Sequence, residues 1–221
     1  MKKLTVLLSV LAVTFGWSTS SHAYPITVDF TGNIYTVGSS LSLSGVNVND
    51  TVTGQFRYDT TAGQPPNNTS TDPSYQWYSL QGFDISLGSS FSATSSSTIG
   101  YVQNDQQAGA TQADGMTARG VTVTGNTLLN GRAVVRYQFG LSKNNSAGQL
   151  WSDTSMLDTA DWAGVTLADI NRPSWNWMMF ERSPTDSSIF DSQIRWDVTS
   201  FNVTAVPEPS TLLLFGAGML G

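Results

Sequence analysis

The sequence contains no cysteine and a single histidine, His22, among its 221 residues. Lysine and glutamate are also scarce, because Lys143 and Glu181 are the sole examples between residues 24 and 205. Disulfides, cysteine nucleophiles and zinc sites built from cysteine are therefore excluded. If the first residues are removed on export, the histidine is lost with them, which also excludes a serine-histidine-aspartate triad.

The N-terminal segment has the organisation of an export signal. Lys2 and Lys3 precede an apolar run from Leu4 to Phe15, and a stretch of small residues ends at Ala23. This order is typical of a secretory signal peptide, and the run is shorter than the roughly 20 residues that span a bilayer. We therefore predict that residues 1–23 are a signal peptide for the Sec route, cleaved by signal peptidase between Ala23 and Tyr24.

The shortage of lysine and glutamate also bears on the fold class, since both residues favour helix surfaces. The region between residues 24 and 205 is instead rich in serine, threonine and glycine. Residues 51–58 and 133–141 alternate apolar and polar side chains with a period of two, the pattern of half-buried strands. About ten short strands separated by turns predict an all-β protein. We expect a single antiparallel two-sheet sandwich of the jelly-roll kind over residues 24–205.

Four local signals give finer expectations. Residues 26–37 are interpreted as an opening hairpin that turns at Thr31-Gly32-Asn33, and Asn130-Gly131 predicts a second hairpin turn. Asp158 is predicted to cap a short helical turn. The apolar positions change from even to odd numbers between Val198 and Phe201, which predicts a β-bulge near Thr199-Ser200.

The acidic composition limits the partners and suggests one cation. After cleavage, eight basic residues face sixteen acidic ones, a net charge of −8, and no basic cluster is present, so nucleic acid is excluded as a partner. Carboxylates bind calcium in exported proteins, and four aspartates near each other are candidate ligands: Asp153, Asp158, Asp161 and Asp169. The alternative is that they cap turns. No EF-hand spacing is present, and no cofactor is expected.

Carboxylates also define a candidate hydrolase. Glu181 is the one glutamate inside the folded region, and a glycan-active hydrolase would pair it with an aspartate at a defined separation. The spacing selects no single partner among the candidates, which are Asp29, Asp59, Asp84, Asp186, Asp191 and Asp197.

Tryptophan suggests sugar binding, because a flat ring can stack on the apolar face of a sugar. Six tryptophans remain after cleavage, and most are expected in the core. Trp151 and Trp162 lie in irregular segments, so these two are the candidates for a sugar-stacking site.

The C-terminal segment, residues 206–221, has an unusual order. Pro207-Glu208-Pro209 is followed by an apolar stretch that carries no charge. This tail resembles the PEP-CTERM sorting signal of exported Gram-negative bacterial proteins. The resemblance implies processing by an exosortase, a membrane protease, and a transient membrane association through the tail. Twelve residues after Pro209, at about 1.5 Å each, cannot span about 30 Å, and no basic cluster follows, so we interpret the transmembrane segment as truncated.

These features together favour a non-enzymatic protein of the cell surface or extracellular matrix. Because proteins with this tail are linked to bacteria that make extracellular polysaccharide and biofilm, the resemblance implies association with such a polysaccharide. Two alternatives stay open: an exported glycan-active hydrolase that uses Glu181 and an aspartate, and a purely structural or adhesive surface protein.

Overall fold

The computed structural model describes residues 25–42, 44–61, 75–103, 113–124, 128–144, 151, 154–169 and 176–205. The predicted cleavage site at Ala23 and Tyr24 and the tail at 206–221 lie outside these ranges. The strands are β1 (Pro25–Val37), β2 (Thr51–Asp59), β3 (Tyr75–Leu80), β4 (Gly82–Leu87), β5 (Phe91–Gln103), β6 (Ala113–Thr124), β7 (Leu128–Leu129), β8 (Arg132–Asn144), β9 (Asn176–Phe180) and β10 (Gln193–Ala205). The short helices are η1 (Ser39–Leu41), α2 (Thr159–Trp162), η4 (Leu167–Asp169) and η6 (Ile189–Ser192).

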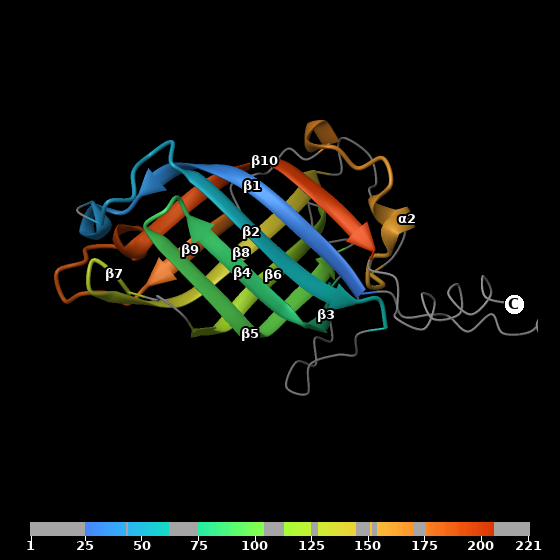
Figure 1. Ribbon diagram of the computed structural model, residues 1–221, viewed down its shortest axis with the longest axis horizontal. Coiled ribbons are helices and arrows are strands. Elements are labelled where there is room, and N and C mark those ends of the chain that lie inside the picture. Colours follow the sequence, from blue (N-terminus) through green and yellow to red (C-terminus); the bar gives the residue numbers. More distant parts are fainter. Residues whose placement is uncertain are drawn as a thin grey trace, which may run out of the picture.

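The strands form one closed antiparallel barrel (Figure 1). From β1 the pairing runs through β2, β4, β5, β6, β8 and β9 to β10, and β10 pairs back with β1. β3 leads into β4 through a bend at Gln81 and pairs with the second half of β5. The result is an eight-stranded up-and-down barrel. The all-β prediction is confirmed, but the two-sheet sandwich is wrong, because closure between β1 and β10 leaves no second sheet.

Aromatic side chains fill the interior of the barrel. Phe30, Phe56, Phe83, Tyr137 and Phe139 point inward and are at most 3% exposed. Their ring centroids are separated by 4.4 Å for Phe30 and Phe139 and by 4.6 Å for Phe83 and Tyr137. An eight-stranded barrel is just wide enough for its side chains to fill. The described part of the barrel interior is therefore a packed core.

Strand β1 corrects the predicted opening hairpin, because it continues unbroken from Pro25 to Val37. Gly32 permits a close approach and does not turn the chain. A Cβ atom at this position would lie 2.5 Å from the carbonyl oxygen of Asp197 and 2.9 Å from Trp196 Cδ1. The glycine therefore lets β10 lie flat against β1.

The other three local predictions are confirmed. On β10, Ser200 pairs with Thr31 and Val198 pairs with Gly32, so Thr199 is the extra residue of a β-bulge. Asn130 and Gly131 have φ angles of 52° and 75° in the turn between β7 and β8. Asp158 caps α2 by accepting hydrogen bonds from the backbone amides of residues 160 and 161.

The two ends of the barrel are closed differently. At one end, Ser39 and Ser40 of η1 donate hydrogen bonds to Asp191 of η6. At the other end, the segment 154–169, which contains α2, lies over the barrel opening (Figure 1). We call this second end the α2 end. Among the described residues, no helix has the length and apolar character that crossing a membrane requires.

Candidate functional site

The two tryptophans that the sequence singled out lie together at the α2 end. Trp162 belongs to the segment 154–169, which we call the plug. Trp151 and Trp162 are 4% and 5% exposed, and their ring centroids are 5.7 Å apart in an edge-on arrangement. Both indole nitrogens are satisfied internally: Trp151 Nε1 donates to the carbonyl of Asp161, and Trp162 Nε1 donates to the hydroxyl of Tyr58. As they stand, the rings pack against each other and present no stacking platform, because both are buried at the end of the barrel that the plug covers.

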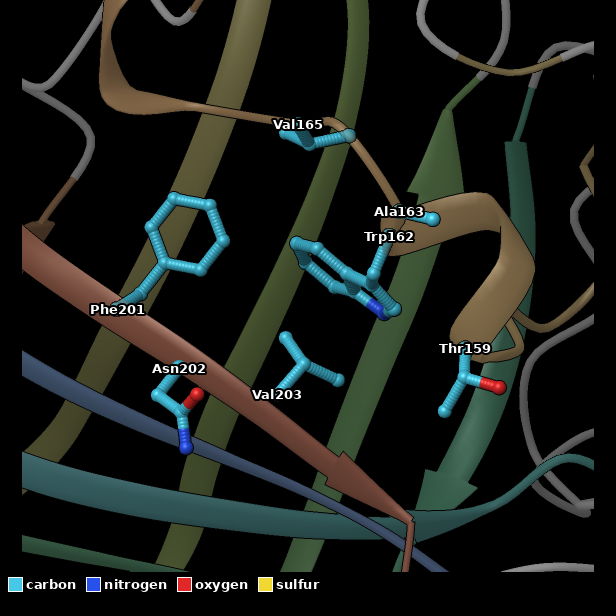
Figure 2. A pocket seen from close by; sticks show the side chains of 7 residues that line it. All are labelled: Thr159, Trp162, Ala163, Val165, Phe201, Asn202 and Val203. Atoms are coloured by element: carbon cyan, nitrogen blue, oxygen red, sulfur yellow. The ribbon is translucent and has the colours of Figure 1, made fainter.

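A small open groove lies beside this plug. Figure 2 shows its lining, with Trp162 and Val165 facing Phe201 and Val203 on β10. The groove has a volume of about 250 Å³, and Asn202 and Thr159 stand at its rim. The bulge at Thr199 places Phe201 and Val203 on this inward side of β10. The groove therefore lies between the plug and the C-terminal part of β10.

The predicted calcium ligands have structural partners where the structure describes them. The carboxylate of Asp158 caps α2, and Asp161 Oδ2 accepts a hydrogen bond from the backbone amide of Asp158 at 2.8 Å. Asp153 and the side chain of Asp169 lie outside the described residues. Within the described ranges, no three acidic or histidine side chains gather closely enough to hold a metal ion. The turn-capping alternative accounts for Asp158 and Asp161.

The candidate hydrolase carboxylates are spread over the barrel. Glu181 follows β9 and is exposed, and its carbonyl accepts a hydrogen bond from Arg132 Nη1. Among the possible partners, Asp186 is linked to Glu181 through a shared residue, because the same Arg132 forms an ion pair with the Asp186 carboxylate at 2.6 Å. That hydrogen bond from Arg132 is the main reason why the pKa of Asp186 is below its usual value. Asp186 is thus held in a structural ion pair.

The remaining candidates sit in separate contacts. Asp84 pairs with Arg57 at 3.1 Å on the outside of the barrel, and Asp29 accepts a hydrogen bond from Gln55. Asp59 accepts hydrogen bonds from Thr61, and Asp191 closes the opposite end of the barrel. Asp197 lies on β10, and burial raises its pKa. Within the described residues, no contact joins the side chain of Glu181 to any of these carboxylates.

An outer-wall feature that the sequence did not reveal crosses six strands. We call it the arginine–aromatic row and define it by Trp77 on β3, Tyr101 on β5, Arg119 on β6, Arg136 on β8, Trp177 on β9 and Arg195 on β10. Register places the row on one face: Trp77 is opposite Tyr101, Arg119 is opposite Gln138, and Gln138 is opposite Trp177, which is opposite Arg195. Five steps of about 4.8 Å separate the first strand from the last.

Rings and guanidinium groups are in contact along this row. The Arg119 guanidinium carbon lies 5.5 Å from the Trp77 ring centroid and 5.4 Å from that of Tyr101. The Arg136 carbon lies 5.0 Å from the Trp177 centroid. Each distance is within the range of a cation–π interaction. Aromatic rings of the row therefore hold Arg119 and Arg136 in place on the wall.

The electrostatics of the row differ from those of the rest of this acidic protein. The ion pairs formed among the described residues use Arg57 and Arg132, so none involves a row arginine. Burial is the main cause that lowers the pKa of Arg119, and the nearby charge of Arg136 acts in the same direction. Three positive charges therefore share one face, and no carboxylate in the described part of the chain forms an ion pair with them.

Both ends of the barrel chain meet at the α2 end. Ile26, near the start of β1, pairs with Ala205, the last residue of β10 (Figure 1). The predicted cleavage site at Ala23 and Tyr24 lies two to three residues before Ile26, and Pro207 follows Ala205 by two residues. The predicted signal peptide and the C-terminal tail are therefore joined to strands that meet at the same end of the barrel.

The comparison with protein families identifies that tail. The model of the PEP-CTERM protein-sorting motif matches residues 205–221, which include Pro207, Glu208 and Pro209. No curated protein and no solved structure matches the chain. The chain thus carries a PEP-CTERM sorting motif directly after its barrel, which makes it an exported exosortase substrate sorted to the cell envelope or surface.

Proposed function

We propose that this protein is a non-enzymatic component of the cell surface or extracellular matrix, and that it associates with extracellular polysaccharide through the outside of its barrel. The observation that carries the proposal is the packed interior. Because aromatic rings occupy the lumen, a polymer has to be recognised on the outer wall. The sorting motif supports the setting, since it directs the protein to the surface where such polymers are found.

The position of the tail supports an orientation. While the tail holds the protein at the membrane, the α2 end faces the membrane, because β10 ends there. The side wall and the end closed by η1 and η6 are then directed outward. A polymer in the surrounding matrix has free access to the wall in this arrangement.

Co-sedimentation of the exported protein with the polysaccharide of its own matrix tests this function. The purified processed protein is mixed with the extracted polysaccharide, and the bound fraction is measured against a matched amount of bovine serum albumin. We expect the barrel protein to bind the polysaccharide saturably and albumin not to bind it. A bound fraction equal to that of albumin would contradict the proposal and favour a structural role with no polysaccharide ligand.

The glycan-active hydrolase remains a prediction from the sequence and is tested separately. Release of reducing sugar from the same polysaccharide is followed with the wild-type protein and with Glu181→Gln. If the wild-type protein releases sugar and the variant does not, the protein is an enzyme and the non-enzymatic part of the proposal is wrong.

A further inference from the structure

We propose that the arginine–aromatic row binds the carboxylate groups of an acidic polysaccharide, one built from uronic acid units. This inference rests on the proposed function and deepens it, since it names the binding surface and the chemical class of the polymer. Three observations support it: the arginine donors are held in fixed orientations, aromatic rings lie beside them, and the row is positively charged on an otherwise acidic protein.

The donors of the row are oriented; Arg136 is exposed, and Arg119 and Arg195 are partly buried. The guanidinium group of Arg136 makes no hydrogen bond or ion pair within the described part of the chain while it lies over Trp177. Arg119 Nε donates to Gln138 Oε1 at 2.6 Å, which fixes the plane of its side chain. Arg195 is held in turn by Gln193 Oε1 and by the exposed ring of Phe190, 4.4 Å away. A guanidinium group fixed in this way suits the two oxygens of a carboxylate.

The aromatic rings supply the second element of sugar recognition. Trp77 and Trp177 are half-buried, and the row places them on the same wall as the arginines. Each ring has a guanidinium group over it, so the part of the ring that stays exposed beside the arginine supplies the apolar contact area for the C–H groups of a sugar. A polymer that carries both a carboxylate and an apolar sugar face therefore matches both kinds of side chain in the row.

Charge favours an anionic polymer over a neutral one. The nearest described carboxylate along β10 is that of Asp197, two residues from Arg195, and burial raises its pKa. It forms no ion pair with a row arginine, and neither does any other carboxylate that the structure describes. A carboxylate bound at this surface offsets the repulsion between neighbouring arginines, because it supplies a negative charge close to them. A neutral polymer does neither.

The test compares defined polymers and matched variants of the exported protein. Binding of polygalacturonate, dextran and double-stranded DNA is measured by co-sedimentation or by tryptophan fluorescence, at low and at physiological salt. The test variant is Arg136→Gln, because this side chain is exposed and its replacement leaves the barrel core intact. The control is Arg57→Gln, which removes the same charge from β2, whose Arg57 is already paired with Asp84. Thermal unfolding of both variants verifies the fold.

The expected result is binding of polygalacturonate but of neither dextran nor DNA, with weaker binding as salt is added. Arg136→Gln should weaken it about tenfold, the loss expected for one charge-assisted hydrogen bond, whereas Arg57→Gln should leave it unchanged. Equal binding of dextran, tighter binding of DNA, or equal losses in the two variants would each overturn the assignment to this row. Each of these outcomes leaves the proposed function intact as long as the protein binds the polysaccharide of its own matrix, which the co-sedimentation described above measures separately.

Discussion

Tyr58 and Trp162, 104 residues apart in the chain, share a buried hydrogen bond in which the indole Nε1 donates to the phenol oxygen at 2.8 Å. The same hydroxyl donates to the carbonyl of Leu157 at 2.9 Å. Tyr58 lies on β2 in the barrel wall, and its two partners belong to the plug. Burial raises the pKa of Tyr58, so its hydroxyl stays neutral and remains a donor. The Tyr58 hydroxyl thus makes two hydrogen bonds that join the plug to the wall, and the Tyr78 hydroxyl adds a third by donating to the carbonyl of Thr154.

Replacing Tyr58 by Phe should destabilise the protein by about 1–3 kcal/mol, because the change leaves a buried indole donor and a buried carbonyl without their partner. The free energy of unfolding in urea measures the loss. The control is Trp162→Phe, combined with Tyr58→Phe in a double-mutant cycle. If the two losses simply add, the hydrogen bond between the two side chains does not fasten the plug.

The sequence allowed the strand content to be predicted but not the closure of the sheet. Period-two alternation identifies one buried face per strand, and this face looks the same in a sandwich and in a barrel. The difference lies in the pairing of Ile26 with Ala205, which joins the two ends of the described chain. Nothing local near either residue signals that contact. The bulge at Thr199 was predictable, because one extra residue changes the phase of the pattern within a single strand.

The site residues show the same division between local and long-range information. The aspartate cap of α2 was predictable from residues within one turn, whereas the burial of Trp151 and Trp162 was not. From the sequence, residues in an irregular segment are expected to be exposed. The tertiary structure shows that the plug covers the end of the barrel and that both tryptophans are buried there. The arginine–aromatic row was missed because each strand contributes a single member. Its members become neighbours once the order and register of the strands are known.

Asp191 links η1 and η6, and its titration should be visible in acid. Hydrogen bonds from the Ser187 hydroxyl, the Ser188 amide and the Ser39 hydroxyl lower the pKa of Asp191 to about 2 from a usual 3.8. A lowered folded-state pKa stabilises the fold above the unfolded value. This contribution is complete above about pH 4 and disappears as the pH falls toward 2.

Asp191→Asn should therefore be less stable than the wild-type protein at pH 6, and the difference should shrink steadily between pH 4 and pH 2. Melting temperatures of the two proteins over this range measure the effect, and their difference removes the titration of other carboxylates such as Asp186. A constant difference down to pH 2 would show that the carboxylate charge has no part in joining η1 to η6.

Gly120 on β6 makes room for the ring of Tyr137, and this can be tested with one methyl group. A Cβ atom at Gly120 would lie 2.6 Å from Tyr137 Cζ, well inside contact distance. Gly120→Ala should therefore destabilise the barrel by about 1–3 kcal/mol, since the packed lumen gives the ring no free space. The matched control is Gly82→Ala on β4, where the nearest atom would be 3.5 Å away, and where reduced freedom of the unfolded chain should make the change neutral or slightly stabilising. Urea unfolding of both variants decides the matter: equal stabilities would mean that the barrel interior is loosely packed around Tyr137.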